Sequence, residues 1–503
     1  MERKDACARV VIHADEPVAF INPNIYGHFA EHLGSLVYDG LWVGPGSSIP
    51  NKNGIRLDVV NALKQLQIPV LRWPGGCFAD DYHWRDGIGP REQRPVRMNL
   101  WWGGTESNAF GTHEFFELCA LLGAEPYVCC NVGSGTPGEM REWLEYMNAE
   151  LDTTLTRERA KNGSPEPLGT RFIGLGNESW GCGGNMTPQF YASEYSRFAT
   201  YAQGMKYLVK IASGANADDY DWTRKFFESL TGKACGCRQN RGPLVDGFAF
   251  HYYCGTSGTA TEYSVTDWYN LIGKALKIEE IMQRHRTIMD EFDPRRAVML
   301  ICDEWGTWHP QMYNTLDPSK RLLQQNTIRD AVVAALTLDV FNRNANIIAM
   351  SNIAQVVNVL QAMILTDGPR MLRTPTYHVY EMYKVHQGGQ SLPIRIESGS
   401  ISFDRDFPSM KRVAGSASRK GNVLTVSLVN VAAKEHASVS LEVRGARGAN
   451  LVRWRSLAGH DIHALNTFDS PDTVQPKERD IDRGDIVLDP ASVNAFTYEL
   501  TFP

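Results

Sequence analysis

Two glutamates stand where a polar side chain directly follows an apolar, strand-like run. Glu178 follows the run 172–177, and Glu304 follows the run 298–303. Glycoside hydrolysis needs two carboxyl groups flanking one bond, one to protonate the leaving oxygen and one to attack or stabilise the developing oxocarbenium ion. A lone glutamate after a strand is more often a capping or solvated loop residue, but this pair, with the amide of Asn177 beside Glu178, favours catalysis. We predict a glycoside hydrolase with a retaining mechanism, in which Glu178 and Glu304 are the catalytic pair.

Other polar and aromatic residues end further apolar runs and fit a sugar-binding site. They are His28 and Glu31 after the first run, Arg72 and the Pro74-Gly75-Gly76 turn after the second, His251 and Tyr253 after the sixth, and Gln355 after the eighth. Each has a structural alternative: a buried ion pair for Arg72, a tight turn for the glycines and core packing for Tyr253. The candidates for aromatic platforms under sugar rings are Trp101, Trp102, Trp180, Trp305 and Trp308. Their structural alternative is core packing, since 12 tryptophans can also fill a large hydrophobic core.

The elements that must position these residues alternate between short β-branched runs and longer amphipathic stretches, as in repeated βα units. The eight runs are 24–29, 70–76, 126–132, 172–178, 210–215, 247–253, 298–305 and 347–355. Helical three- and four-residue spacing marks, among others, 58–67, 113–122, 139–148, 188–207 and 322–341. Eight such units predict an α/β fold that closes as a (β/α)₈ TIM barrel, with an open doubly wound sheet as the alternative. Catalytic groups then belong at the C-terminal ends of the strands.

The hydrophobic pattern changes after about residue 386. There the two-residue alternation of strands, as in 423–431 and 437–443, replaces helical periodicity. This pattern predicts an antiparallel, jelly-roll-like β-sandwich. The strand-like run 8–13 precedes the first barrel strand and is expected to join that sandwich. The expected domains are therefore 1–19 with the sandwich, 20–385 as the catalytic barrel and 386–503 as the sandwich.

Length and charge narrow the function classes. A chain of 503 residues exceeds the size at which one core keeps growing, so a large domain and a smaller one are expected. A net charge of -6 gives no electrostatic reason for nucleic-acid binding. The charged N-terminus resembles no export signal, and no apolar run reaches about 18 residues. We predict no nucleic-acid or membrane partner and a cytoplasmic location.

The cysteines indicate reduced thiols. Ten cysteines in 503 residues are too sparse for a disulfide scaffold, and several lie in apolar runs. Cys182 and the pair Cys235 and Cys237 are weak metal candidates, because one CxC without a second pair is poor evidence. We predict ten free thiols, no metal and no cofactor.

Several segments, taken in order, resemble the signature blocks of glycoside hydrolase family 51 α-L-arabinofuranosidases. They are Gly27-His-Phe-Ala-Glu31-His-Leu-Gly34, Leu71-Arg-Trp-Pro-Gly-Gly76, Gly176-Asn-Glu-Ser-Trp180, His251-Tyr-Tyr253, Cys302-Asp-Glu-Trp305 and Ala354-Gln-Val-Val-Asn358. The resemblance runs from about residue 8 to the C-terminus. It implies an acid/base after strand four and a nucleophile after strand seven, matching Glu178 and Glu304.

The resemblance also implies a furanose pocket. Its hydrogen bonds would come from Glu31, Arg72, Asn177, Tyr253 and Gln355, with Trp102 and Trp308 as walls, and His251 is also predicted to bind substrate. Tyr253 would also orient Glu304. Cys77 stands where many relatives have asparagine, and it is predicted to bind substrate at that position. The implied substrates are arabinofuranosyl-containing oligo- and polysaccharides, and the implied assembly is a homo-oligomer, often a hexamer.

Three functional hypotheses follow. The first is exo-acting removal of terminal non-reducing arabinofuranosyl groups from arabinoxylan, arabinan and their oligosaccharides. The second is an endo-acting glucanase or xylanase, which needs an open groove instead of a pocket. The third is a non-catalytic carbohydrate-binding barrel, disfavoured because a binding module has no need of a matched glutamate pair. Gly174-Leu-Gly176 lacks the third glycine of a dinucleotide site, and no G-x-S-x-G elbow occurs.

Overall fold

The computed structural model describes residues 6–204, 207–231, 245–255, 257–310, 316–403, 409–481 and 485–502. Eight parallel strands close into a barrel in sequence order, with the last strand pairing with the first. They are β3 (Gly27–Phe29), β6 (Val70–Trp73), β9 (Glu125–Cys130), β10 (Phe172–Leu175), β11 (Val209–Asn216), β12 (Gly247–Cys254), β13 (Met299–Thr307) and β14 (Ile348–Ile353). The predicted TIM barrel is confirmed, and each of the eight predicted runs overlaps one of its strands.

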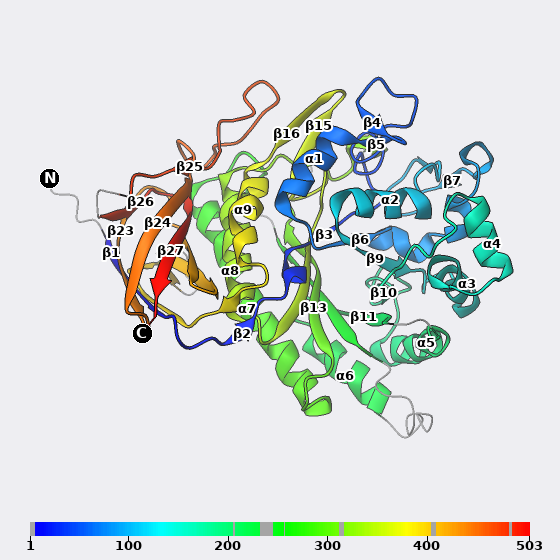
Figure 1. The fold of residues 1–503 in the computed structure, drawn as a ribbon, viewed down its shortest axis with the longest axis horizontal. Helices are drawn as coiled ribbons and strands as arrows, with labels where there is room; N and C mark the ends of the chain where they lie inside the picture. The colour runs from blue at the N-terminus through cyan, green and yellow to red at the C-terminus, as the bar shows by residue number, and fades with distance from the viewer. Residues whose placement is uncertain are drawn as a thin grey trace.

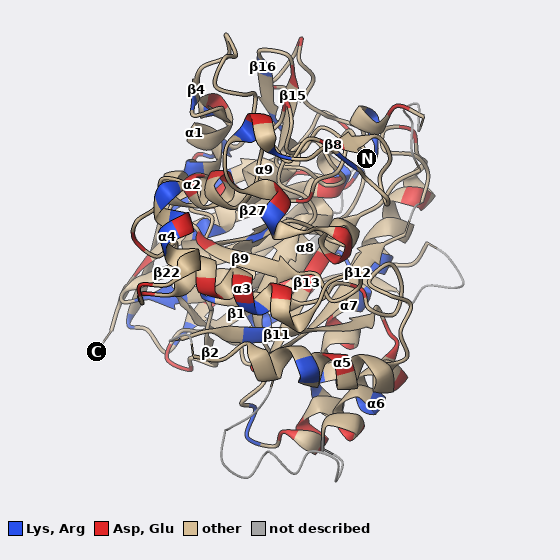
Figure 2. Ribbon diagram, turned by 90° about the vertical axis from the view of Figure 1, so that its right-hand side faces the viewer, with Lys and Arg blue, Asp and Glu red and all other residues tan. Residues whose placement is uncertain are grey.

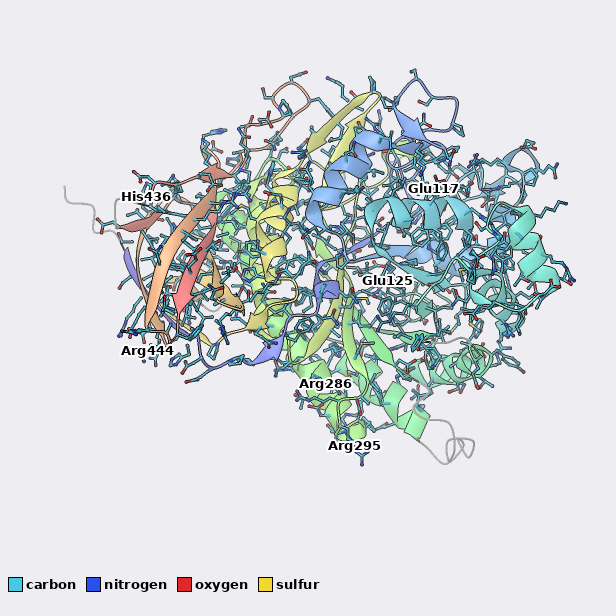
Figure 3. All side chains as sticks on the ribbon, in the orientation of Figure 1. Glu117, Glu125, Arg286, Arg295, His436 and Arg444 are labelled. Carbon is cyan, nitrogen blue, oxygen red and sulfur yellow. A yellow bond between two sulfur atoms is a disulfide. The ribbon has the colours of Figure 1, made fainter. Side chains whose placement is uncertain are left out.

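One layer of the barrel interior explains why these strands read as apolar runs. Seven of the eight strands each contribute one buried residue to a single cluster: Val70, Tyr127, Phe172, Ile211, Ala249, Ile301 and Met350. The eighth strand contributes no side chain there because Gly27 lies so close to Val70 that an added Cβ would come within 2.6 Å of it. Packed layers of this kind fill a barrel and leave its polar residues to the strand ends. Glu125, which begins β9, marks the N-terminal end of the barrel in Figure 3.

Helices cover the outside of the barrel (Figure 1). They are α1 (Leu57–Leu66), α2 (Thr112–Leu122), α3 (Pro137–Asn148), α4 (Thr154–Lys161), α5 (Pro188–Tyr201), α6 (Tyr220–Thr231), α7 (Val265–Phe292), α8 (Ile328–Arg343) and α9 (Pro375–Tyr383). Figure 2 shows acidic and basic residues interspersed along the helices on one side. Among the described residues, no helix is both long and apolar enough to cross a bilayer.

Two predicted helices have different bounds in the structure. The helix expected over 188–207 ends at Tyr201, and the chain then turns through Gly204 at a φ of 82°. The helix expected over 322–341 begins only at Ile328, because Thr327 caps it through a capping box with Asp330. Hydrophobic spacing extended both predictions beyond these end signals.

The C-terminal part forms two packed β-sheets at the left of Figure 1, where both chain ends lie. One sheet has the order β18-β1-β23-β26 and the other β2-β17-β21-β22-β27-β24-β25. Their bounds are β1 (Ala6–His13), β2 (Ala19–Phe20), β17 (Gln390–Ser391), β18 (Ile394–Glu397), β21 (Val413–Lys420), β22 (Val423–Asn430), β23 (Ala437–Arg444), β24 (Gly448–Leu457), β25 (Lys477–Glu478), β26 (Ile486–Leu488) and β27 (Ser492–Thr501). The N-terminal β1 inserts between β18 and β23, and its pairing with β23 is parallel. The predicted antiparallel sandwich is confirmed, with β1–β23 as the one parallel pair among its described strands.

The sandwich and barrel share buried polar contacts along α8. Asp339 accepts hydrogen bonds from Ser416 and Ser427 of the neighbouring sheet, and Arg343 donates to the carbonyl of Gly415 at 2.7 Å. Burial raises the pKa of Asp339 to about 6, while the two hydroxyls favour its charged form. These bonds tie the two parts together on the side of α8 that faces away from the barrel strands.

Candidate active site

The C-terminal ends of the barrel strands gather the polar residues singled out in the sequence. Arg72 lies in β6, His251 and Tyr253 lie in β12, and Glu304 lies in β13. Glu31, Glu178 and Gln355 follow the ends of β3, β10 and β14. Because parallel strands place their C-terminal ends at one mouth, residues up to 324 positions apart in the chain come into contact here.

Glu304 is buried and held by two hydrogen bonds. Its Oε1 accepts from Arg72 Nη1 at 2.8 Å, and its Oε2 accepts from the hydroxyl of Tyr253 at 2.8 Å. Burial opposes ionisation, but the positive charges of His251 and Arg72 outweigh it, so the pKa of Glu304 lies below its usual value. Glu304 is therefore a carboxylate with fixed orientation.

Glu178 lies on the other side of His251. Its Oε1 is 2.9 Å from His251 Nδ1, and the same nitrogen is 3.6 Å from Oε2 of Glu304. One carboxylate oxygen of each glutamate lies within 4.8 Å of the other. The two negative charges raise the pKa of His251 above its usual value against the effect of burial. The imidazole therefore bridges the glutamate pair.

Arg72 connects the two sides of the site. Its Nη2 donates to the side-chain oxygen of Asn177 at 2.6 Å, while its Nε lies 3.7 Å from Asp303 Oδ2. The structural alternative, a buried ion pair, is confirmed for this arginine, and its contact with a sugar stays a prediction. Asp303 is a residue that the sequence reasoning missed, and it also accepts from the hydroxyl of Tyr127 at 2.6 Å. Its position beside Glu304 was the only signal.

Three hydrogen-bond donors surround the carboxylate of Glu31. Its Oε1 accepts from the backbone N–H of Phe78 at 3.0 Å and from Trp102 Nε1 at 2.9 Å, and its Oε2 accepts from Gln355 Nε2 at 3.1 Å. Burial and the charge of Glu304 raise the pKa of Glu31 to about 7. A Cβ at Gly76 would lie 2.9 Å from either carboxylate oxygen, so the glycine is needed for this approach.

Asp80 anchors the loop that carries Glu178, and the sequence reasoning missed it. Its Oδ1 accepts from the backbone N–H groups of Val132 and Gly133, and its Oδ2 accepts from that of Asn177 at 2.7 Å. Burial raises its pKa to about 7. Two adjacent aspartates follow the Pro-Gly-Gly turn, and nothing in the pattern distinguishes buried Asp80 from half-buried Asp81.

The aromatic candidates separate into two groups. Trp102 reaches Glu31, and the ring of Trp308 meets that of Tyr253 edge to face with centroids 5.1 Å apart. Trp305, by contrast, is 1% exposed and donates to Ser351, so it belongs to the core. His28 is also buried and packs against Tyr380 of α9, on the outer side of its strand. The interpretation of His28 and Trp305 as sugar contacts is wrong because both side chains pack against the outer helices, His28 against α9 and Trp305 against Phe341 of α8.

The expectation of ten free thiols is wrong for one pair. Cys77 and Cys182 form a disulfide with a Cα–Cα distance of 5.5 Å, and its sulfurs lie 4.0 and 3.5 Å from Glu178 Oε2. Five other described cysteines are buried free thiols: Cys119, Cys129, Cys130, Cys254 and Cys302. The weak CxC candidate, Cys235 and Cys237, lies outside the described residues. Spacing of 105 residues gave no sign of the bond, which depends on the closure of the barrel.

Two groups of side chains at this mouth have metal-ligating atoms close enough to share an ion. They are Cys77, Glu178 and Cys182, and Glu178, His251 and Glu304. In the second group the donors are already paired with one another and with Arg72 and Tyr253. The arrangement of that group suits proton transfer and nucleophilic attack by carboxylates.

A (β/α)₈ barrel with paired carboxylates at the ends of its fourth and seventh strands defines a glycoside hydrolase. Comparison with known proteins identifies the family. The model of the α-L-arabinofuranosidase 1 domain matches residues 62–270, and that of the α-L-arabinofuranosidase C-terminal domain matches residues 303–492. The chain belongs to the family 51 α-L-arabinofuranosidases.

Individual relatives agree over nearly the whole chain. An intracellular exo-α-L-arabinofuranosidase of Bacteroides ovatus is 44% identical over 98% of this chain and 95% of its own. The crystal structure of the family 51 arabinofuranosidase from Xanthomonas axonopodis pv. citri has a TM-score of 0.91 at 37% identity, covering 98% and 100% of the two chains. An α-L-arabinofuranosidase from Thermotoga maritima, solved as an arabinose complex, has a TM-score of 0.85 at 30% identity, with the same coverage.

Proposed function

We propose that the protein is a retaining, exo-acting enzyme that removes terminal non-reducing α-L-arabinofuranosyl groups from arabinoxylan, arabinan and arabino-oligosaccharides. The observation that carries the proposal is the approach of the Glu178 and Glu304 carboxylate oxygens to within 4.8 Å. Retaining enzymes separate their carboxyl groups by about 5–5.5 Å, whereas inverting enzymes leave about 6.5–9.5 Å for a water molecule. The short approach leaves no room for that water.

The two glutamates take different roles because their surroundings differ. Glu304 is held ionised by Arg72 and His251, as a nucleophile requires. Glu178 makes no contact with Arg72 and is more exposed, at 17% of its side chain against 6% for Glu304. We assign it the proton transfers at the leaving-group side of the site.

Double displacement then proceeds in two balanced steps. In the first, a Glu304 oxygen bonds to the anomeric carbon while the glycosidic bond breaks and Glu178 gives its proton to the leaving oxygen. In the second, Glu178 takes a proton from water as that water attacks the anomeric carbon and the bond to Glu304 breaks. The hydroxyl of Tyr253 holds Oε2 of Glu304 in place during attack.

The remaining mouth residues form the proposed furanose pocket. Glu31, Arg72, Asn177, His251 and Gln355 offer polar atoms, and Trp102, Tyr253 and Trp308 form walls. The Oε1 atom of Gln355 is buried without a protein partner, so it is open to a sugar hydroxyl. Cys77 stays in the proposed pocket, but its sulfur is bonded to Cys182 and has no hydrogen to donate.

Removal of each glutamate tests the assignment. Glu304→Ala should be almost inactive on every substrate, because no glycosyl-enzyme can form. Glu178→Ala should still be glycosylated by an aryl arabinofuranoside with a good leaving group, should accumulate a pentosyl adduct on Glu304, and should turn over faster with azide, giving the α-arabinofuranosyl azide. Azide rescue of Glu304→Ala alone would exchange the two roles. If no pentosyl adduct formed on the wild type or on either variant, the retaining mechanism would be refuted.

Substrate comparison tests the exo-acting assignment. We expect release of arabinose from an aryl arabinofuranoside and from branched arabinoxylan oligosaccharides, with no shortening of carboxymethyl cellulose or unbranched xylan. Rapid shortening of a polymer backbone would instead identify an endo-acting enzyme.

We also propose a cytoplasmic location and a homo-oligomeric, possibly hexameric, assembly. The first rests on the Bacteroides ovatus relative, which is named intracellular, and is tested by fractionating the source cells. The second rests on the family resemblance alone. Light scattering coupled to size exclusion measures the assembly, and a mass of about 56 kDa would refute it.

A further inference from the structure

The disulfide at the mouth of the barrel lies against the acid/base glutamate. Cys77 begins the turn after Gly76, and Cys182 lies in the turn four residues after Glu178. Both cysteines are half-buried, whereas the described free cysteines are all buried. A reductant can reach this pair from the mouth, and reduced thiols in such positions are the ones that react or bind metals.

The distances around Glu178 already approach those of a metal site. A tetrahedral ion with sulfur ligands at about 2.3 Å and an oxygen ligand at about 2.1 Å sets each sulfur about 3.5 Å from the oxygen and the two sulfurs about 3.8 Å apart. The sulfurs of Cys182 and Cys77 lie 3.5 and 4.0 Å from Glu178 Oε2. The two sulfur-to-oxygen distances are thus already close to this ligand spacing, and opening of the S–S bond is the change that the ion requires.

The surroundings favour this set of ligands. His251 Nδ1 binds Oε1 of Glu178, which leaves Oε2 directed at the two sulfurs. A ligating carboxylate fixed through its other oxygen is the arrangement that metal sites use to orient their ligands. The side-chain N–H of Asn177 also lies 3.8 Å from the sulfur of Cys182, where it stabilises a thiolate.

We propose that reduction of the Cys77–Cys182 disulfide creates a site for one thiophilic divalent cation, Zn²⁺ being the type, bound by Cys77, Cys182 and Glu178. A phosphine reductant supplies two electrons and becomes its oxide with an oxygen from water, and each sulfur gains a proton. Binding of Zn²⁺ releases those two protons. In the disulfide form neither sulfur is a thiolate, and the site does not exist.

The bound ion inhibits the enzyme, a consequence that rests on the proposed role of Glu178. A carboxylate coordinated to Zn²⁺ can neither donate a proton to the leaving oxygen nor take one from water. General acid/base catalysis contributes about 10²–10⁴-fold, so saturation with Zn²⁺ should reduce turnover by at least about 10²-fold on a substrate with a poor leaving group. A substrate whose leaving group needs no proton should lose less of its glycosylation rate.

Co²⁺ is the probe for binding, because thiolate ligation gives a charge-transfer band that is independent of activity. The full-length protein is compared with and without prior phosphine reduction under anaerobic conditions, after thiol titration has checked that reduction adds two thiols. We expect one Co²⁺ per chain, with a thiolate band, in the reduced protein only. Zn²⁺ should displace it, and a chelator should restore the activity.

Variants separate the site from other thiols. Cys182→Ser should lose the band, whereas Cys119→Ser, which removes a buried thiol of α2, should keep it. Glu178→Gln should keep a thiolate band with at least tenfold weaker binding. A reduced protein without the band, or one that binds equally before reduction, overturns the proposal. A band with inhibition that is independent of the leaving group retains the metal site and refutes the acid/base role of Glu178.

Discussion

Asp80→Asn should impair catalysis through the loop that carries Glu178, the proposed acid/base, although the hydrogen bonds of the Asp80 carboxylate come from backbone N–H groups. The carboxylate accepts three backbone N–H groups, and Oδ2 alone holds the N–H of Asn177 at 2.7 Å. Asparagine can replace Oδ1 with its own oxygen, but its NH₂ group would then meet the N–H of Asn177 with no acceptor. A buried N–H left without a partner costs about 1–3 kcal/mol.

The loop can relieve this cost by shifting the Asn177–Glu178 peptide. The peptide must then return to its original position in the transition state, so the same free energy is added to the activation barrier. At about 1.36 kcal/mol per tenfold, the loss in kcat/KM is between about 5-fold and about 150-fold. Steady-state kinetics on an aryl arabinofuranoside measures the loss, with Asp81→Asn as a matched control that removes a neighbouring charge. The reasoning is refuted if the two variants agree within about twofold, or if Asp80→Asn is merely unfolded by circular dichroism.

The other predictions concern groups that touch the reacting pair or the sugar. Arg72→Ala and Asn177→Ala should reduce kcat more than they raise KM, since sugar contacts tighten in the transition state; a change in KM alone in steady-state kinetics would indicate uniform binding. Tyr253→Phe removes the hydroxyl bond to Glu304, worth about 1.5–3 kcal/mol to a charged acceptor, and should lower kcat/KM by about 10-fold or more in the same assay, so an unchanged value would contradict the positioning role. Because folding raises the pKa of Glu31 from 4.5 to about 7, its contribution to stability is present below about pH 4.5 and lost as pH rises through about 7. The wild-type melting temperature should accordingly fall relative to that of Glu31→Gln over this range, and a constant difference would refute the shift.

The sequence was sufficient to predict the barrel because each strand is an apolar run with a polar residue at its end. The hydrophobic period and the length of each run therefore indicated where a strand lies and which end of it faces the barrel mouth. Glu178 follows β10 and Glu304 lies in β13, at the expected strand ends. Helix ends were less predictable, since hydrophobic spacing continues past a cap such as Thr327. The parallel pairing of β1 with β23 was not predictable, because alternation gives the faces of a strand but not its partner.

Contacts between different strands and loops at the barrel mouth could not be predicted from sequence patterns. Asp80 and Asp303 each stand beside a residue of similar type, and their function appears only when other strands bring backbone N–H groups or Tyr127 to them. The Cys77–Cys182 bond likewise joins the loops of two barrel strands that are not sequential neighbours. The cysteine count predicted that cysteines in this chain are free in general. It could not show that closure of the barrel brings Cys77 and Cys182 together.

The two glutamates proposed as catalytic are chemically identical, so any difference between their roles has to come from the fold. Glu304 lies within a strand, where Arg72 and Tyr253 fix each of its oxygens and favour its charge. Glu178 lies in a loop at a φ of 40°, and its partners are His251 and two sulfurs, none of which donates a permanent positive charge. A carboxyl that must hold and release a proton in alternate steps requires such a neighbourhood. Because His251 holds only Oε1 of Glu178, Oε2 is open to a metal once the sulfurs are reduced. The residue proposed for acid/base work is therefore also the point at which a metal ion can stop the enzyme.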